Sequence, residues 1–249
     1  MRKLYNIILT VLACGVLFSC TTDNAAAPAA DGVQGAGGSM ARFAINGNYL
    51  YAVDHSNLHV FNISIPEDPQ QGQQVPIGFG IETIFPFEDK LFIGTQTGMH
   101  IYSIQQPESP KHISQYQHVV SCDPVVTDGR YAYVTLSTGT ACRQAINELQ
   151  IVDLQNITAP TLLKQYGMTN PKGLGIDQGK LFVCDEGLKV YDATDVMELE
   201  LVQHFQIKAF DVIPDNGRLL VIGSDGLYQY RLENDKLKLL STILIKPSI

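Results

Sequence analysis

A repeat with a spacing of 41 residues constrains the fold of this chain more than any other feature of its sequence. The segment Asn48–Ala52 is followed 41 residues later by Asp89–Ile93, and after another 41 by Arg130–Val134. The same pattern, a turn residue before an alternating apolar run, returns at Gly179–Val183 and Gly217–Val221, after steps of 49 and 38 residues. A repeat of this length indicates one supersecondary unit used several times. We therefore expect five units.

Each unit contains short runs in which apolar and polar residues alternate. After the repeated segment comes a turn with Gly or Asn and a second alternating run, as in Leu58–Ile63, Met99–Ile104 and Leu149–Leu154. A shorter apolar run precedes the repeated segment, and a further run such as Leu162–Tyr166 follows the second. Period-two alternation of β-branched and aromatic residues is typical of β-strands. We predict four antiparallel strands per unit.

Four short strands in a repeat of about 42 residues are typical of a β-propeller blade, because one four-stranded sheet cannot bury both of its faces alone. The sequence predicts an all-β, five-bladed β-propeller over residues 40–249, and five such blades would close a ring. The approximate blades are 40–80, 81–121, 122–170, 171–208 and 209–249. A β-sandwich is the competing architecture, but a sandwich does not produce a 41-residue self-similarity.

The third unit resembles a known repeat. Its segment Leu149–Leu154, with the letters Leu-Gln-Ile-Val-Asp-Leu, is followed by a polar turn that ends at Pro160, and it is similar to the LVIVD repeat. The same frame, with prolines after the strand, follows Ile101–Ile104 and Val60–Ile63, whereas the last two units lack the prolines. The resemblance extends over residues 40–249. It implies a bacterial secreted or surface β-propeller, a family for which there are no agreed catalytic residues.

The N-terminus has the pattern of a secretory signal. Arg2 and Lys3 precede an apolar run from Leu4 to Phe18. This run is shorter than the roughly 20 apolar residues of a membrane-spanning helix, and a short apolar run after a basic start is typical of a signal peptide. We therefore expect the segment to be removed from the mature protein.

The end of the signal resembles the lipobox of bacterial lipoproteins, since Leu17 and Ser19 stand before Cys20 in the expected frame. The resemblance implies a signal peptide at 1–19 and fatty acyl chains such as palmitate on Cys20, which would anchor the protein to a membrane. An ordinary signal peptide cut near Ala25 to Ala30 is the alternative.

Residues 20–39 are predicted to be the lipidated cysteine and a flexible linker, because they contain almost no large apolar side chain. Thr21, rather than an aspartate, follows Cys20, which resembles the outer-membrane sorting pattern of lipoproteins. We expect a protein of the cell envelope, lipid-anchored in the outer membrane and facing the periplasm or the cell surface.

The charge balance argues against nucleic acid as a partner. The chain has 17 basic and 25 acidic residues, and removal of Arg2 and Lys3 leaves 15 basic residues, a net charge of −10. An acidic surface of this size repels nucleic acid and anionic lipid headgroups. The membrane contact is therefore expected through the lipid on Cys20 alone.

Export permits a disulfide bond. Cys14 leaves with the signal and Cys20 is the predicted lipid site, so Cys122, Cys142 and Cys184 remain. If the first two strands of the third blade form a hairpin, Cys122 and Cys142 lie at the same end of it and within disulfide reach. We predict a disulfide between these two cysteines and a free, buried thiol at Cys184.

The third unit is also longer than the others, because residues are inserted between its second and third predicted strands, from Leu136 to Glu148. Departures from a regular pattern are where function is expected. The Cys122–Cys142 bridge either only fastens this long loop or rigidifies a binding rim. The residues of that candidate rim are Asp123, Thr138, Arg143 and Asn147.

Carboxylates recur just past the second strand of several units, at Asp54, Asp185 and Asp225. If the ring closes, these side chains point towards one rim near the central channel, where a hard cation such as calcium would suit them. Polar residues at strand ends also serve simply as turn formers. Apart from calcium, the sequence indicates no cofactor.

Two classes of function remain. A non-enzymatic binding or interaction propeller, whose rim recognises an envelope protein or glycan, is favoured because no acid and base set converges in the sequence. The alternative is a propeller hydrolase or lyase with a metal or carboxylate site in the central channel, in which a metal-bound water is the nucleophile.

Overall fold

The structure, a computed structural model, describes residues 37–118, 124–137 and 146–245. These residues form twenty β-strands and no helix. The strands form five four-stranded antiparallel sheets, and each sheet uses four consecutive strands in chain order. The predicted all-β, five-bladed propeller is confirmed. No helix that could span a membrane occurs within these described ranges.

The strands have the following bounds. Blade 1 contains β1 (Phe43–Asn46), β2 (Tyr49–Val53), β3 (Asn57–Asn62) and β4 (Gln70–Pro76). Blade 2 contains β5 (Ile81–Phe87), β6 (Lys90–Thr95), β7 (Gly98–Ser103) and β8 (Lys111–Gln117). Blade 3 contains β9 (Val125–Thr127), β10 (Tyr131–Leu136), β11 (Glu148–Asp153) and β12 (Thr161–Gly167). Blade 4 contains β13 (Leu174–Asp177), β14 (Lys180–Cys184), β15 (Leu188–Asp192) and β16 (Glu200–Phe205). Blade 5 contains β17 (Ala209–Asp215), β18 (Arg218–Gly223), β19 (Gly226–Glu233) and β20 (Lys236–Leu244).

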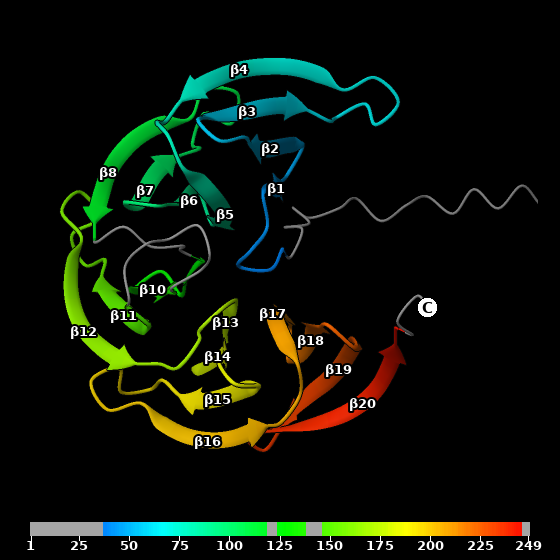
Figure 1. The fold of residues 1–249 in the computed structure, drawn as a ribbon. Helices are drawn as coiled ribbons and strands as arrows, with labels where there is room; N and C mark the ends of the chain where they lie inside the picture. The colour runs from blue at the N-terminus through cyan, green and yellow to red at the C-terminus, as the bar shows by residue number, and fades with distance from the viewer. Residues whose placement is uncertain (1–36, 119–123, 138–145, 246–249) are drawn as a thin grey trace, which may run out of the picture. The chain divides into compact units, whose positions relative to one another are not determined.

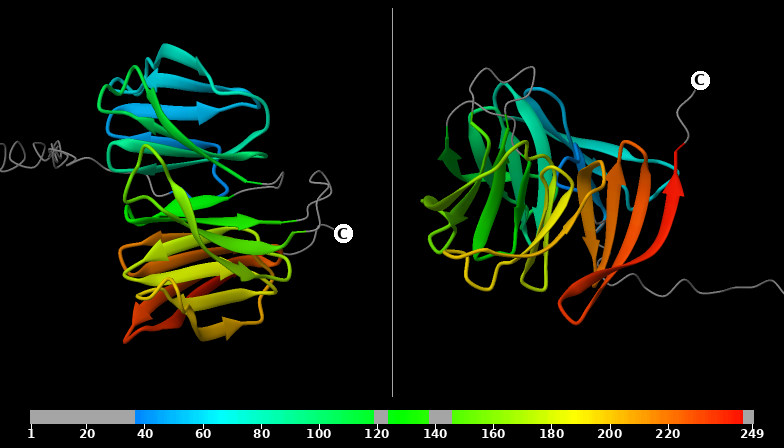
Figure 2. Two further views of the ribbon diagram at one scale, coloured as in Figure 1. Left: turned by 90° about the vertical axis from the view of Figure 1, so that its left-hand side faces the viewer. Right: turned by 60° about the horizontal axis from the view of Figure 1, so that its bottom comes forward.

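The blades follow one another around a common centre in chain order (Figure 1), and Figure 2 shows them face against face. The first strand of each blade is innermost: β1 packs on β5, β5 on β9, β9 on β13 and β13 on β17. The fourth strands β4, β8, β12, β16 and β20 lie on the outside (Figure 1). Loops at either end of the inner strands therefore come together near the centre.

Tight turns explain why the repeat begins with Gly or a small polar residue. In blade 4 the turn between the first two strands uses Gln178 at φ 48° and Gly179 at φ 71°, and in blade 5 it uses Asn216 at 48° and Gly217 at 77°. Two consecutive residues with positive φ join strands with the right-handed twist of a hairpin, and Gly and Asn tolerate this conformation best. The turn residue thus fixes the register of the hairpin that follows.

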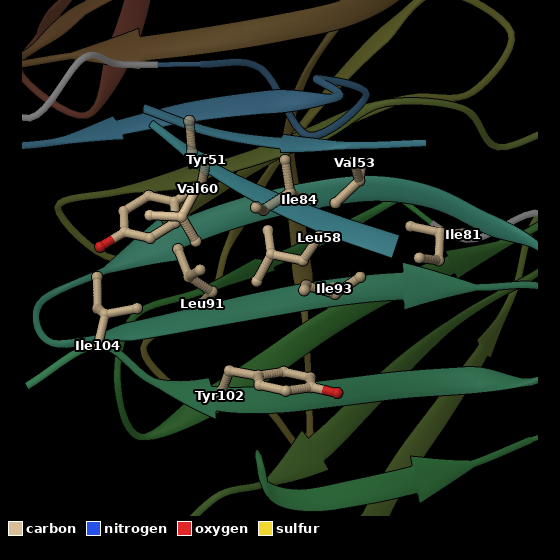
Figure 3. Close-up of a cluster of buried hydrophobic side chains, with 11 residues drawn as sticks. Tyr51, Val53, Leu58, Val60, Ile81, Ile84, Leu91, Ile93, Tyr102 and Ile104 are labelled. Atoms are coloured by element: carbon tan, nitrogen blue, oxygen red, sulfur yellow. The ribbon is translucent and has the colours of Figure 1, made fainter. Parts of the chain in front are cut away.

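Four clusters of buried apolar side chains hold the blades together, one at each junction from blade 1–2 to blade 4–5. At the first junction Tyr51, Leu58 and Val60 of blade 1 face Leu91 and Ile93 of blade 2, all fully buried (Figure 3). Burial of one Leu or Ile side chain contributes about 1.5–3 kcal/mol. Because the second strand of an inner blade contacts a neighbour on both faces, β6, β10 and β14 are buried along nearly their whole length.

The polar residue that ends the third strand caps a turn. In blades 1 to 4 the last residue of the third strand accepts a hydrogen bond from the backbone N–H two residues later. The acceptors are Asn62 (2.9 Å), Ser103 (3.3 Å), Asp153 (2.7 Å) and Asp192 (2.9 Å). Asp, Asn and Ser are favoured at such positions because their short side chains reach the following backbone. An aspartate at this position, as at Asp153 and Asp192, is therefore a turn former.

In blades 2, 3 and 4 the same turns accept a hydrogen bond from the blade before. Tyr51 of blade 1 donates from its hydroxyl to the carbonyl of Pro107 in the blade 2 turn at 2.9 Å. Ser114 of blade 2 likewise donates to Ile157 of blade 3 at 2.6 Å, and Tyr166 of blade 3 donates to Val196 of blade 4 at 2.9 Å. Tyrosine hydroxyls at buried positions need such partners.

The junction between blades 5 and 1 is built differently from the other four. No strand of blade 5 packs on a strand of blade 1 in the manner of the inner strands elsewhere in the described ranges. The outward sides of β2 and β18 are only half buried, for example at Leu50 and Ile222. A groove of about 330 Å³ lies between Phe43 and Ile45 of β1 and Ile213 of β17. The ring expected from the sequence is therefore not closed by direct packing of sheets.

The chain just before β1 bridges this junction instead. Ser39 is buried, and its hydroxyl donates to Asp211 Oδ1 of blade 5 at 3.1 Å and accepts from the backbone N–H of Leu174 of blade 4 at 2.8 Å. Gly38 lies so close that a Cβ there would come within 2.1 Å of Asp211 Oδ2. The segment Gly37–Met40 is thus fitted to blades 4 and 5 before the chain enters blade 1.

Candidate ligand-binding site

A hollow of about 460 Å³, called here the rim pocket, opens at the end of the inner strands where second strands end and first strands begin. Four blades contribute to its lining, through residues just before a first strand or just after a second one. The lining residues are Met40, Arg42, His55, Phe79, Gly80, Ile81, Glu82, Thr83, Gln96, Pro124, Ser137 and Lys172. This volume is in the range of small-ligand pockets, which combine apolar walls with a few polar groups.

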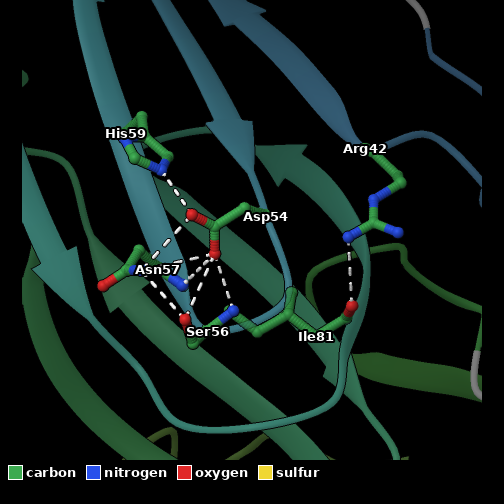
Figure 4. A network of polar contacts seen from close by, with 6 residues as sticks. All are labelled: Arg42, Asp54, Ser56, Asn57, His59 and Ile81. Carbon is green, nitrogen blue, oxygen red and sulfur yellow. Dashed lines mark hydrogen bonds and ion pairs between the residues drawn. The ribbon is translucent and has the colours of Figure 1, made fainter.

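Two cations stand at the rim pocket. Arg42, just before β1, donates from Nη2 to the carbonyl oxygen of Ile81 in blade 2 at 3.4 Å (Figure 4). Lys172, just before β13, has its backbone fixed on both sides: its N–H donates to the Cys184 carbonyl at 2.9 Å, and its carbonyl accepts from the Thr135 hydroxyl at 2.6 Å. Both side chains are exposed.

Phe79 presents an aromatic ring at the pocket edge. It is 82% exposed and lies between Gly78 and Gly80, which have φ angles of 134° and 85°. The backbone around it is held: Gly80 N–H donates to the His55 carbonyl at 2.9 Å, and Gln96 N–H donates to the Gly80 carbonyl at 2.9 Å. The ring therefore stands on a fixed backbone, and an exposed aromatic face of this kind can stack on a ligand.

One carboxylate lines the rim pocket. Glu82, near the start of β5, accepts a hydrogen bond at Oε1 from Nε2 of Gln96 at 3.2 Å. Both side chains are half buried. The pocket thus offers two cations, an aromatic ring and one carboxylate, which accepts a hydrogen bond from the side-chain amide of Gln96.

Asp54, a predicted cation ligand, is engaged in a turn next to β2. Its carboxylate accepts from the N–H groups of Ser56 and Asn57 at 2.7 Å each, and Oδ2 lies 2.8 Å from His59 Nε2 (Figure 4). The hydrogen bond with His59 and then those from the two N–H groups hold the pKa of Asp54 well below its usual range. The carboxylate oxygens of Asp54 are therefore engaged by the N–H groups of this turn and by His59.

Asp185 is likewise engaged, and its side chain is fully buried. It accepts from the N–H groups of Thr169 at 3.1 Å and Asn170 at 2.6 Å, and pairs with Lys189 Nζ at 2.7 Å. Burial opposes ionisation, but these donors outweigh it and lower the pKa of Asp185 below its ordinary value. In Asp225, Oδ1 is buried without a partner in the described ranges.

The three aspartates each lie just past a second strand, as the repeat predicts, but Asp54 is bound by N–H groups of its own turn, whereas the N–H donors of Asp185 lie in the connection before β13. Within the described ranges no group of three or more His, Cys, Asp or Glu side chains is placed to hold a metal ion. Asp54 thus acts as a turn former.

Of the predicted binding rim, only Asn147 lies within the described residues. It directly precedes β11 and donates from Nδ2 to the Thr169 carbonyl at 2.7 Å, which ties the end of the insert to the connection between β12 and β13. Cys122, Asp123, Thr138, Cys142 and Arg143 lie outside the described residues. The insert does lie between β10 and β11, as expected, and Ser137 at its start lines the rim pocket. Cys184 is the predicted free, buried thiol.

Sequence reasoning missed the residues that define the rim pocket, above all Arg42, Phe79 and Lys172. A signal was present for Phe79: a large aromatic residue between two glycines, outside every predicted strand, is unusual in an interior connection. Arg42 and Lys172 carry no such signal, because they lie 130 positions apart in a chain with other isolated basic residues.

Comparison with known proteins agrees with the repeat geometry. A model of the LVIVD repeat matches residues 37–70 and 121–168, which contain β1 to β3 of blade 1 and all four strands of blade 3. Two segments of this chain thus match the LVIVD repeat. In the two matched blades these segments supply the third strand and the capped turn after it. No curated protein shows a significant match to the whole chain.

Solved structures share the fold at low sequence identity. A protein from Lactobacillus plantarum is 16% identical with a TM-score of 0.65, over 80% of this chain and 69% of its own. A functionally unknown protein from Desulfotomaculum acetoxidans is 13% identical, with a TM-score of 0.59 over 79% and 68% of the two chains. The periplasmic gluconolactonase of Pseudomonas aeruginosa is 14% identical, with a TM-score of 0.59 over 80% and 68%. These likenesses concern the fold alone.

Proposed function

We propose that this chain is a lipid-anchored protein of the bacterial cell envelope whose propeller is a non-enzymatic binding module, with its ligand held in the rim pocket. The observation that carries the proposal is the pocket itself, which four blades line and at whose edge Phe79 is exposed on a hydrogen-bonded backbone. A ligand there contacts several blades at once and meets groups that are already positioned, so little ordering entropy opposes binding.

The chemistry of the lining favours binding over catalysis. The two cations can attract a ligand and the aromatic ring can stack on it, while the carboxylate of Glu82 is already bound to Gln96. We expect the ligand to be a glycan or a segment of an envelope protein. Either class offers flat or apolar faces that suit Phe79.

A screen of envelope-derived glycans and peptides by thermal shift and calorimetry tests this function, with Phe79→Ala as the pocket variant. Ile65→Ala is the matched control, because Ile65 is also an exposed apolar residue, 58% accessible, but does not line the pocket. Binding that survives Ile65→Ala and is lost in Phe79→Ala supports the proposal. Binding that is unchanged in Phe79→Ala contradicts it.

The membrane anchor is tested separately. The resemblance to a lipobox supports acylation of Cys20, a position outside the described residues. The mature wild-type chain should show the mass of attached acyl chains at its N-terminus and fractionate with the outer membrane. Cys20→Ala should lack the added mass and leave the membrane fraction. A Cys20→Ala protein that stays in the membrane fraction contradicts the anchor.

A lactone hydrolase is the second candidate, and it rests on the fold shared with the periplasmic gluconolactonase of Pseudomonas aeruginosa. In this chain Glu82 is the pocket carboxylate that could act as a general base. Opening of gluconolactone above the spontaneous rate, with and without added divalent cations and lost in Glu82→Gln, would favour this candidate. A rate equal to the spontaneous one favours the binding module.

A further inference from the structure

Arg42 and Lys172 have no carboxylate partner among the described residues, a property that they share with other exposed basic residues such as Arg218 and Lys236. Lys180, Lys189 and Arg130 each pair with an aspartate at 2.6–2.8 Å. Neither Arg42 nor Lys172 forms an ion pair with any residue in the described ranges. Two cations without acidic partners at one pocket are notable in a chain whose formal net charge is −8.

The two cations reach the pocket from different blades. Arg42 comes from blade 1 and Lys172 from blade 4, so the pocket lies between them. Lys172 also lines a neighbouring hollow of about 400 Å³ together with Lys208 and Glu186. Three cations, Arg42, Lys172 and Lys208, and two carboxylates, Glu82 and Glu186, thus line the two hollows, an excess of one positive charge, and low-dielectric walls strengthen the field inside such hollows.

We propose that the rim pocket recognises a carboxylate on its ligand, held by Arg42 and Lys172, with an apolar or sugar-ring face of the same ligand against Phe79. A planar guanidinium and an ammonium complement carboxylate oxygens by charge-assisted hydrogen bonds. Phe79 supplies the apolar contact at the edge of the same hollow. The inference rests on the proposed binding function and names the ligand chemistry of that site.

Two sources could provide this chemistry, an acidic sugar or the C-terminal carboxylate of a peptide, and matched probes separate them. Glucuronic acid is compared with glucose, and N-acetylphenylalanine with its amide, by calorimetry on the full chain. Each comparison changes only the carboxylate. The charged member of at least one pair should bind at least about tenfold more tightly than its neutral partner, since a charged hydrogen bond contributes about 1.5–3 kcal/mol.

Substitutions at the two cations then test whether they bind the carboxylate of the probe. Arg42→Gln and Lys172→Gln should each lower the affinity for the charged probe by roughly tenfold and leave the affinity for the neutral probe unchanged. Lys236→Gln is the matched control: it removes the same charge from an exposed position at the start of β20, outside the pocket. The affinity of the charged probe should also fall as salt is added, because screening weakens the attraction between partly exposed charges.

The outcomes distinguish this inference from the proposed function. Equal affinity for charged and neutral probes, or equal losses in Lys172→Gln and Lys236→Gln, overturns carboxylate recognition. If a neutral ligand binds and is lost in Phe79→Ala, the binding function stands and the inference fails. If no carboxylate probe binds at millimolar concentration, the inference also fails.

Discussion

Ser39 and Asp211, which are 172 positions apart in the chain, share a buried hydrogen bond of 3.1 Å at the junction between blade 5 and blade 1. The other junctions are held by sheet faces packed on each other, whereas this one depends on a short segment ahead of the first strand. Residues 37–39, the end of the predicted linker, are therefore part of the folded structure.

Ser39→Ala should lower the free energy of unfolding by about 1–2 kcal/mol, because Asp211 loses a buried donor and Leu174 N–H loses its acceptor. The measurement is urea unfolding of the full chain. Ser241→Ala is the control, since Ser241 is exposed and its hydroxyl donates to Gln229 at 3.3 Å. Equally small changes in the free energy of unfolding for the two substitutions would mean that the Ser39 hydrogen bonds do not stabilise this junction.

Asp211 should make the protein more stable as the pH falls from 7 to 5. Burial raises the pKa of Asp211 to about 6, against an ordinary value of 3.8. Between these two values the folded state binds more protons than the unfolded state, so this contribution is fully present below about pH 4 and is lost as the pH rises through 6. Asp211→Asn removes the effect. Its stability relative to wild type should rise between pH 5 and pH 7, as measured by urea unfolding at each pH.

His100 should act in the opposite direction over a similar range. Burial, and then the neighbouring His112, lower the pKa of His100 to about 4 from 6.5, and its Nδ1 is buried without a hydrogen-bond partner in the described ranges. Its contribution is therefore present above pH 6.5 and is lost as the pH falls towards 4, because the unfolded state takes up the proton first.

Replacement by a residue that does not titrate tests this directly. His100→Phe should be more stable relative to wild type at pH 5 than at pH 7. His59→Phe is the comparison, because His59 occupies the equivalent position of blade 1 but pairs with Asp54. A constant difference between wild type and His100→Phe across this pH range would contradict the assignment.

The Asp185–Lys189 pair should matter more for stability than exposed pairs of the same type. Asp185→Asn leaves the ammonium of Lys189 without its carboxylate at a buried site, and the expected cost is about 3 kcal/mol. Asp153→Asn, which breaks an exposed pair with Arg130, should cost clearly less than Asp185→Asn, because solvent screens an exposed pair. Chemical unfolding of both variants gives the comparison. Similar losses of unfolding free energy would contradict the larger contribution expected of the buried pair.

Repeat periodicity predicted the fold because each blade is a local structure. Turn residues such as Gly179 and Gly217, strand alternation and the capping residues Asp153 and Asp192 all act within one blade, over a few positions of sequence. The strand-end aspartates could be located from the sequence for the same reason, but their partners differ. Asp54 is bound by N–H groups of its own turn, whereas Asp185 is bound by the N–H of Asn170, which lies ahead of blade 4.

The sequence by itself determined the number of blades, the four strands in each and the position of the insert, since those follow from short-range patterns. Only the tertiary structure decided how the last junction is made and which side chains meet at the rim. Arg42, Phe79 and Lys172 come together because the inner strands of different blades end near one centre, and Ser39 meets Asp211 because the chain returns to its start. Such contacts depend on the relative placement of distant segments, which a periodic pattern does not encode.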